Sequence, residues 1–215
     1  MLDKPFELWF NRTMTHLTED QILDVLRAAR DKSARDQAMV TLAYLHGLRA
    51  SEVCTLKVAD VDMANLQLTV QRLKGSALTV QPLVVIKGEP LLNEPAILRK
   101  YLAERRAIED GSDYLFLSVK GGAVSREHFT RLVKAYCIAA SLARVLKKKS
   151  PIADNLRHAH ALKHSIASHL VGRMDLFRVK QFLGHKSINS TMIYTHGSDT
   201  DASSDALKVL MDTYS

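Results

Sequence analysis

The hydrophobic residues near the start of the chain recur with helical spacing. Apolar side chains occupy positions i, i+3, i+4 and i+7 from Ile22 to Ala29, which predicts one buried face of a helix. Thr18 and Gln21 match a capping box, so this helix should begin directly after Thr18. A second helix is predicted over residues 35–46, and Gly47 should break it.

The spacing changes from helical to alternating in residues 66–83. Apolar and polar residues alternate from Leu66 to Val70 and again from Leu78 to Val80. This pattern predicts a β-hairpin with its turn near Gly75. Pro82 should end the second strand or mark it as an edge strand, because proline cannot donate a ladder hydrogen bond.

Helical spacing returns after the hairpin and continues to the end of the chain. A short helix is also predicted to start at Ser51, and longer helical segments are predicted at about 91–108, 125–146, 160–194 and 203–213. The lysine-rich segment 147–155 should be a loop. The chain is therefore predicted to be mainly α with a small antiparallel β-sheet.

Composition places the chain among folded globular proteins and suggests a polyanionic partner. Hydrophobic residues make up 47% of the 215 residues, which excludes a disordered tail. No run of about 18 apolar residues is present and the N-terminus shows no secretory signal, so we expect no contact with a membrane. The net charge of +7 fits nucleic acid, although many basic proteins bind none specifically.

The two cysteines, Cys54 and Cys137, lie far apart among helix-forming residues. We expect buried free thiols rather than a disulfide or a metal site, and hence a protein of the reducing cytoplasm.

The segment from His160 to Leu170 has a cationic face beside an apolar one. Its leucine and isoleucine residues are spaced by four and should face the core, whereas His160, Lys163 and His164 share a neighbouring arc. Three potential cations on one arc could form an anion cradle or simply a solvated helix face. This segment alone does not decide between them.

Five short motifs, in order along the chain, resemble those of the tyrosine recombinase (phage integrase) family. They are GLRASE at 47–52, Lys74 at the hairpin, His160-Ala-Leu-Lys163, LGH at 183–185, and Tyr194 nine positions after His185. The resemblance spans residues 15–200 and implies the family's catalytic-domain fold. The segments around Arg49 and Lys74 look most similar to the small fimbrial phase-variation invertases.

The resemblance implies a role for each matching residue. Tyr194 would be the nucleophile that attacks a DNA phosphate, and Lys74 would be the general acid, with Lys87 as a less favoured substitute. Arg49, His160 and His185 would bind the phosphate, and His160 would also assist deprotonation of the tyrosine. Glu52, which would orient Arg49, and His164 would support them. The family chemistry needs no metal or other cofactor.

Lys163 is a departure from the family pattern, which has arginine at this position. Lysine keeps the positive charge but loses the planar fork that binds two phosphate oxygens. The hypothesis is that Lys163 is a working substitute; the alternative is a slow enzyme, or one that has become a DNA-binding regulator.

Other basic residues are weaker candidates for contacts with the DNA backbone. They are Arg126, Arg131, Lys134, Arg144, Lys147, Lys148 and Lys149. Taken singly, each is better read as a solvated surface charge, but as a group they could position DNA without reading its sequence.

The expected organisation is an N-terminal extension (1–14), the catalytic domain (15–200) and a tail helix (201–215). The family's larger members carry an N-terminal clamp domain that is absent here, either because it was removed or because this is a natural minimal member. The tail could pack on its own domain or be exchanged between protomers.

The resemblance thus predicts a site-specific recombinase of bacterial or phage origin that acts on double-stranded DNA at the nucleoid. It should be a homo-oligomer on DNA, as a tetramer, and could be a monomer in solution. A DNA-binding regulator of the same fold and a type IB topoisomerase-like relaxing enzyme are the alternatives.

Overall fold

The first two helices form as their capping and spacing predict. In this computed structural model, Thr18 and Gln21 make both hydrogen bonds of the capping box, and α1 (Glu19–Lys32) starts directly after Thr18. The apolar residues of α1 are buried, and so is nearly all of α2 (Ala34–Leu45). Helix α2 therefore forms the centre of the core, with α1, α4 and α6 packed against it.

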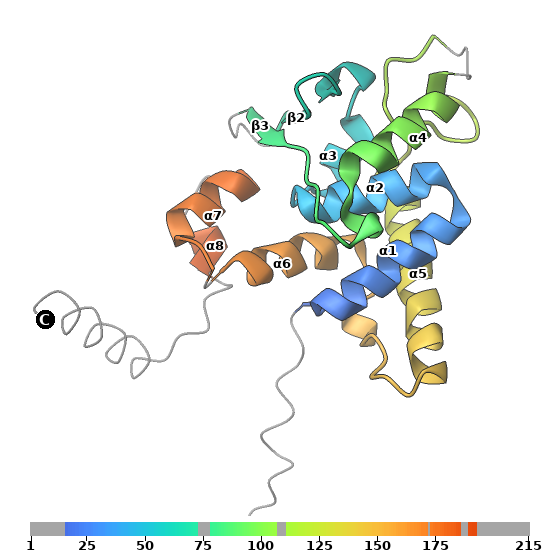
Figure 1. Cartoon of the computed structure of the whole chain (residues 1–215), viewed down its shortest axis with the longest axis vertical. Helices are drawn as coiled ribbons and strands as arrows, with labels where there is room; N and C mark the ends of the chain where they lie inside the picture. Colours follow the sequence, from blue (N-terminus) through green and yellow to red (C-terminus); the bar gives the residue numbers. More distant parts are fainter. Residues whose placement is uncertain (1–15, 73–77, 107–110, 172, 186–188, 193–215) are drawn as a thin grey trace, which may run out of the picture.

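The structure describes residues 16–72, 78–106, 111–171, 173–185 and 189–192. The remaining helices are α3 (Ala50–Thr55), α4 (Glu94–Arg106), α5 (Arg126–Leu146), α6 (Ala159–Leu170), α7 (Leu176–Leu183) and α8 (Asn189–Met192), with single 3-10 turns at Val58–Asp60, Pro90–Leu92 and Asp154–Leu156. Figure 1 shows α6 leading from the main helical body to the smaller α7–α8 unit. The fold class, mainly α with a small antiparallel sheet, is confirmed.

The two strands of the predicted hairpin pair within a three-stranded antiparallel sheet, and the turn predicted near Gly75 lies outside the described residues. Strand β2 (Gln67–Val70) pairs with β3 (Thr79–Pro82), which ends at Pro82 as predicted. The short β1 (Val61–Asp62) on the other side of β2 was not predicted, because two residues carry no readable alternation.

The two strands of the hairpin differ in how well their alternation matches burial. In β2, Leu68 and Val70 are buried as expected, whereas Leu78 and Val80 beside and in β3 are each 54% exposed. Gln81 takes the buried position instead, where its amide is hydrogen-bonded on both sides. In β3, therefore, the alternation of apolar residues does not indicate which side chains are buried. The buried position holds a glutamine because its amide bonds to His46 and to the Phe182 carbonyl.

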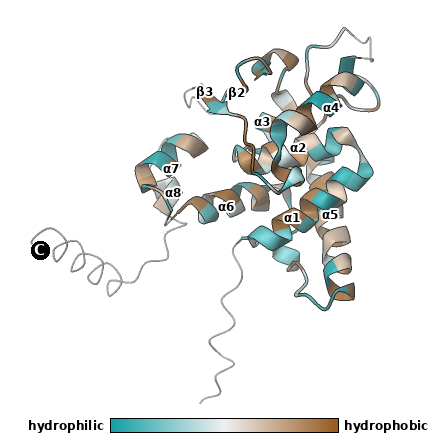
Figure 2. Ribbon diagram, viewed as in Figure 1, coloured by the Kyte–Doolittle hydropathy of each residue, from teal (hydrophilic) through white to brown (hydrophobic). Residues whose placement is uncertain are grey.

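Figure 2 shows the apolar residues concentrated between the helices of the main body. Cys54 and Cys137 are both buried and free, as predicted. Among the described residues, no helix is long and apolar enough to cross a bilayer.

Candidate active site

Arg49 stands at the start of α3, with its side chain held by Glu52. The Arg49 backbone N–H donates to Glu52 Oε2 at 2.8 Å, and its Nη1 donates to Oε1 at 2.8 Å. Glu52 is fully buried, but the Arg49 side chain remains 28% exposed. Glu52 therefore makes the contact expected of a residue that orients Arg49, and part of the Arg49 side chain stays exposed to solvent.

Burial alone would raise the pKa of Glu52, but that pKa is lowered overall. The hydrogen bond from the Arg49 backbone and the positive charges of Lys163 and Arg72 outweigh the cost of burial. Glu52 is thus held as a carboxylate within the site.

Lys163 is buried, with only 3% of its surface exposed, so it is not part of a solvated helix face. Its Nζ donates to the carbonyls of Gly47 at 2.6 Å and Leu183 at 3.0 Å. Burial, together with the charges of Arg72 and Arg49, lowers its pKa to about 7. Lys163 therefore joins the turn before Arg49 to the turn before His185.

His185 follows the left-handed Gly184 that ends α7. Its Nδ1 lies 2.9 Å from the Thr191 hydroxyl of α8, a hydrogen bond that fixes the ring. Burial and the charges of Lys163 and Arg49 lower its pKa to about 4. The free site therefore holds a neutral His185 at pH 7.

His160 and His164 lie one turn apart on α6, with ring centroids 5.2 Å apart in an edge-on arrangement. The pKa of each is lowered, first by partial desolvation and then by neighbouring positive groups, which for His160 include Lys163 and Arg49. His160 is exposed and His164 half-buried. The protonated form of each group lowers the pKa of its neighbours. A bound anion would stabilise all of these protonated forms.

The model of the phage integrase family matches residues 15–201, which is most of the chain. This chain is a member of the phage integrase family. It is 30% identical over 189 residues to the type 1 fimbriae regulatory protein FimB of Escherichia coli (strain K12), covering 86% of each. The agreement confirms the family resemblance of the sequence motifs.

Two further relatives of this phage integrase family member are longer than it is. Tyrosine recombinase XerD of Xanthomonas campestris is 35% identical over 186 residues, covering 83% of this chain and 54% of the relative. The fold also matches a crystal structure of the XerH site-specific recombinase bound to difH substrate, with a TM-score of 0.71 and 26% sequence identity. The match covers 89% of this chain and 53% of the XerH chain. The chain thus spans little more than half of these proteins.

Arg72 belongs to this integrase-family site, but its place there could not be predicted from the sequence. It is 1% exposed and its Nη1 lies 3.2 Å from Glu52 Oε2. It also donates to the carbonyls of His46 at 3.1 Å and Phe182 at 2.8 Å. Arg72 stands among other polar residues of the hairpin segment, such as Gln71, so the sequence does not indicate which partners the guanidinium meets.

Two predicted catalytic residues, Lys74 and Tyr194, lie outside the described residues, as do the N-terminal extension and the tail helix. Their roles in this family member stay predictions. Lys87 is exposed on the loop after β3. Among the described residues, no group of three or more His, Cys, Asp or Glu side chains is placed to hold a metal ion.

The predicted DNA-contacting residues are distributed along α5 and the loop after it. Arg126, Arg131 and Lys134 are exposed near the start of α5. The prediction is wrong for Arg144, which is buried and paired with Asp20 at 2.9 Å and Asp24 at 2.7 Å. Its guanidinium fastens α5 to α1 and cannot also bind a phosphate.

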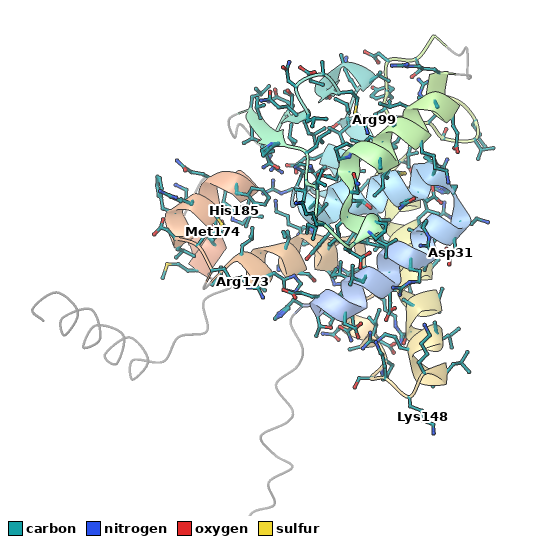
Figure 3. All side chains as sticks on the ribbon, in the orientation of Figure 1. Asp31, Arg99, Lys148, Arg173, Met174 and His185 are labelled. Atoms are coloured by element: carbon teal, nitrogen blue, oxygen red, sulfur yellow. The ribbon has the colours of Figure 1, made fainter. Side chains whose placement is uncertain are left out.

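The basic run Lys147–Lys149 is exposed. Figure 3 labels Lys148 at the far end of α5, well away from His185. This run therefore lies away from the site around His185.

Proposed function

We propose that this chain is a site-specific DNA recombinase that cuts and rejoins DNA strands through a 3′-phosphotyrosyl intermediate. The observation that carries the proposal is the convergence of Arg49, Lys163 and His185, drawn from three separate segments. Lys163 is hydrogen-bonded to the residues two positions before each of the other two. The names of its relatives, which describe tyrosine recombinases, support the same activity.

In the proposed reaction, Arg49, Lys163 and His185 bind the non-bridging oxygens of one phosphodiester. They stabilise the negative charge that develops on those oxygens in the pentacoordinate transition state. The Tyr194 oxygen attacks phosphorus, helped by His160, which assists loss of the phenolic proton. The bond from phosphorus to the 5′ oxygen breaks, and Lys74 gives that oxygen its proton. Attack by the 5′-hydroxyl of a second strand reverses these steps and restores the tyrosine.

The substrate would be double-stranded DNA, which we expect the protein to meet at the nucleoid. Exposed Arg126, Arg131 and Lys134 on α5 would contact the DNA backbone outside the cut phosphate. Replacing any of them with alanine should weaken binding and reduce its salt dependence without changing the preferred sequence.

We further propose that the chain works as a homo-oligomer on DNA, as a tetramer, through its tail helix. A pocket of about 420 Å³ between α1, α2 and α6 is lined by apolar residues that include Ile22, Leu45 and Ile166. The sequence pattern of the tail predicts a helix with Leu210 on an apolar face, so the tail of a neighbouring copy would have matching chemistry. Leu210→Asp should reduce the mass of the complex on DNA in analytical ultracentrifugation, and an unchanged mass would contradict this assembly.

The test of the proposed function is covalent capture. Duplexes tiled across the DNA that flanks the coding gene would carry a bridging phosphorothiolate at each successive position, so that strand cleavage cannot be reversed. The wild-type protein should form a covalent complex with at least one duplex, and peptide mapping should place the link on Tyr194. Tyr194→Phe should bind the same duplex without forming the complex.

A DNA-binding regulator of the same fold is the second candidate, favoured by lysine at position 163 where the family has arginine. If the chain is a regulator, the wild type and Tyr194→Phe should both bind DNA sequence-specifically, and neither should form a covalent complex. A relaxing enzyme would instead form the complex on many unrelated duplexes and relax any supercoiled plasmid.

A further inference from the structure

The last carbonyls of α7 lie directly before Gly184 and His185. Carbonyls at a helix C-terminus have no partner within their own helix. Here the Phe182 carbonyl accepts from Arg72 Nη2 at 2.8 Å and from Gln81 Nε2 at 2.9 Å. The Leu183 carbonyl accepts from Lys163 at 3.0 Å. Side chains from the hairpin and from α6 therefore hold the end of the helix that presents His185.

Arg72 also reaches the turn that presents Arg49. Its Nη2 donates to the His46 carbonyl at 3.1 Å and its Nη1 to the Gly47 carbonyl at 3.4 Å. The same Nη1 pairs with Glu52, the carboxylate that holds Arg49. One guanidinium thus contacts both turns and the residue that orients the first arginine.

The aliphatic part of Arg72 packs directly on the Gly184 turn. A Cβ atom added to Gly184 would lie 2.8 Å from Arg72 Cγ and 2.9 Å from Cδ. Gly184 also has a φ of +63°, which favours glycine. The turn before His185 is therefore shaped around the Arg72 side chain as well as bonded to its guanidinium.

We propose that Arg72 is a positioning residue that sets the distance between Arg49 and His185 without touching DNA. Its guanidinium is occupied by carbonyls and by Glu52, and the residue is 1% exposed, so it is not a phosphate ligand. The five N–H groups of arginine lie in one plane and can reach acceptors on both turns at once. Lysine, with three N–H groups on one atom, cannot span them.

This inference rests on the proposed function, and its test separates the two. Arg72→Lys is compared with Arg105→Lys, because Arg105 is also buried and donates to backbone carbonyls, those of Ser112 and Tyr114, away from the site. The first measurement is the single-turnover rate of covalent complex formation at saturating protein, on the duplex that the wild type captures best. The affinity for that duplex and the melting temperature are measured alongside.

Arg72→Lys should slow cleavage by about 10- to 100-fold, because small displacements of groups around a reacting phosphate are costly. Its DNA affinity should stay within about twofold, since the backbone contacts elsewhere remain. Arg105→Lys should cleave at the wild-type rate although its melting temperature falls about as much as that of Arg72→Lys. An unchanged rate for Arg72→Lys, or an equal loss for Arg105→Lys, would overturn the proposal.

Two further measurements cover failure of the variant or of the reaction. If Arg72→Lys does not fold, Gln81→Met removes the other donor to Phe182 and should slow cleavage by about threefold or more; a wild-type rate would then refute positioning. If the wild type captures no duplex, the proposed function fails and imidazole ¹⁵N NMR decides the inference. Arg72→Lys should shift the His185 resonances but not those of His169, which bonds to Tyr44 and Leu17; unmoved His185 resonances would contradict it.

Discussion

The buried Lys163 ammonium should make the stability of this protein rise with pH in a window where most proteins lose stability. Burial and two neighbouring arginines lower the pKa of Lys163 from its ordinary 10.5 to about 7. Lys163→Met removes the titrating group and keeps an unbranched side chain of related length. The difference in unfolding free energy between the wild type and this variant isolates the lysine.

The sign follows from which state holds the proton. Between pH 7 and 10.5 the unfolded chain protonates Lys163 and the folded chain does not, so raising the pH favours folding. Each pKa unit corresponds to about 1.4 kcal/mol, so the wild type should gain about 2 kcal/mol over Lys163→Met from pH 7 to pH 9. Below pH 7 both states hold the proton, the full cost of burying the charge is present, and the difference should level off.

Urea unfolding at intervals from pH 6 to pH 9.5 measures this difference. Lys134→Met, which removes an exposed lysine of α5, reports the effect of losing one positive charge. His185 does not interfere, because its pKa of about 4 puts its titration below the window. A difference between the wild type and Lys163→Met that stays constant from pH 7 to pH 9 would refute the reasoning.

Three other predictions concern the same turns. Lys163→Arg should lower stability by about 1–3 kcal/mol in urea unfolding and slow covalent capture, because a larger cation enters a filled interior; faster capture would show a site impaired by lysine. Gly184→Ala should cost more stability than Gly121→Ala: both have positive φ, but only the Gly184 Cβ would collide, with Arg72 at 2.8 Å; equal losses would contradict this. DNA binding at pH 8 should take up protons, because a bound phosphate should raise the pKa of Lys163. Calorimetry in buffers of different ionisation enthalpy measures this uptake, and an uptake of zero would contradict the prediction.

The features that the sequence predicted well are local or carried by motifs. The capping box at Thr18 needs only residues three positions apart, so its hydrogen bonds could be read before the fold was known. The convergence of Arg49, Lys163 and His185 followed from the family resemblance, because the motif order carries information about tertiary structure that periodicity lacks.

The features that were missed depend on long-range packing. Arg72 and Gln81 looked like ordinary hairpin residues, yet both are buried because the carbonyls of another helix need donors. Arg144 looked like a DNA contact because its partners, Asp20 and Asp24, lie more than a hundred positions earlier. Long basic side chains are hard to assign from sequence, since the acceptor that decides their role is remote.

Arg72 also gives a physical reason why lysine is suited to position 163. The Gly47 carbonyl accepts from Lys163 at 2.6 Å and from Arg72 at 3.4 Å, so a guanidinium already lies beside the ammonium. A second guanidinium would compete for that carbonyl and set two planar cations against each other. A compact ammonium avoids this and still makes both carbonyl bonds. Lysine at position 163 thus lacks the planar fork of arginine but joins the turn before Arg49 to the turn before His185.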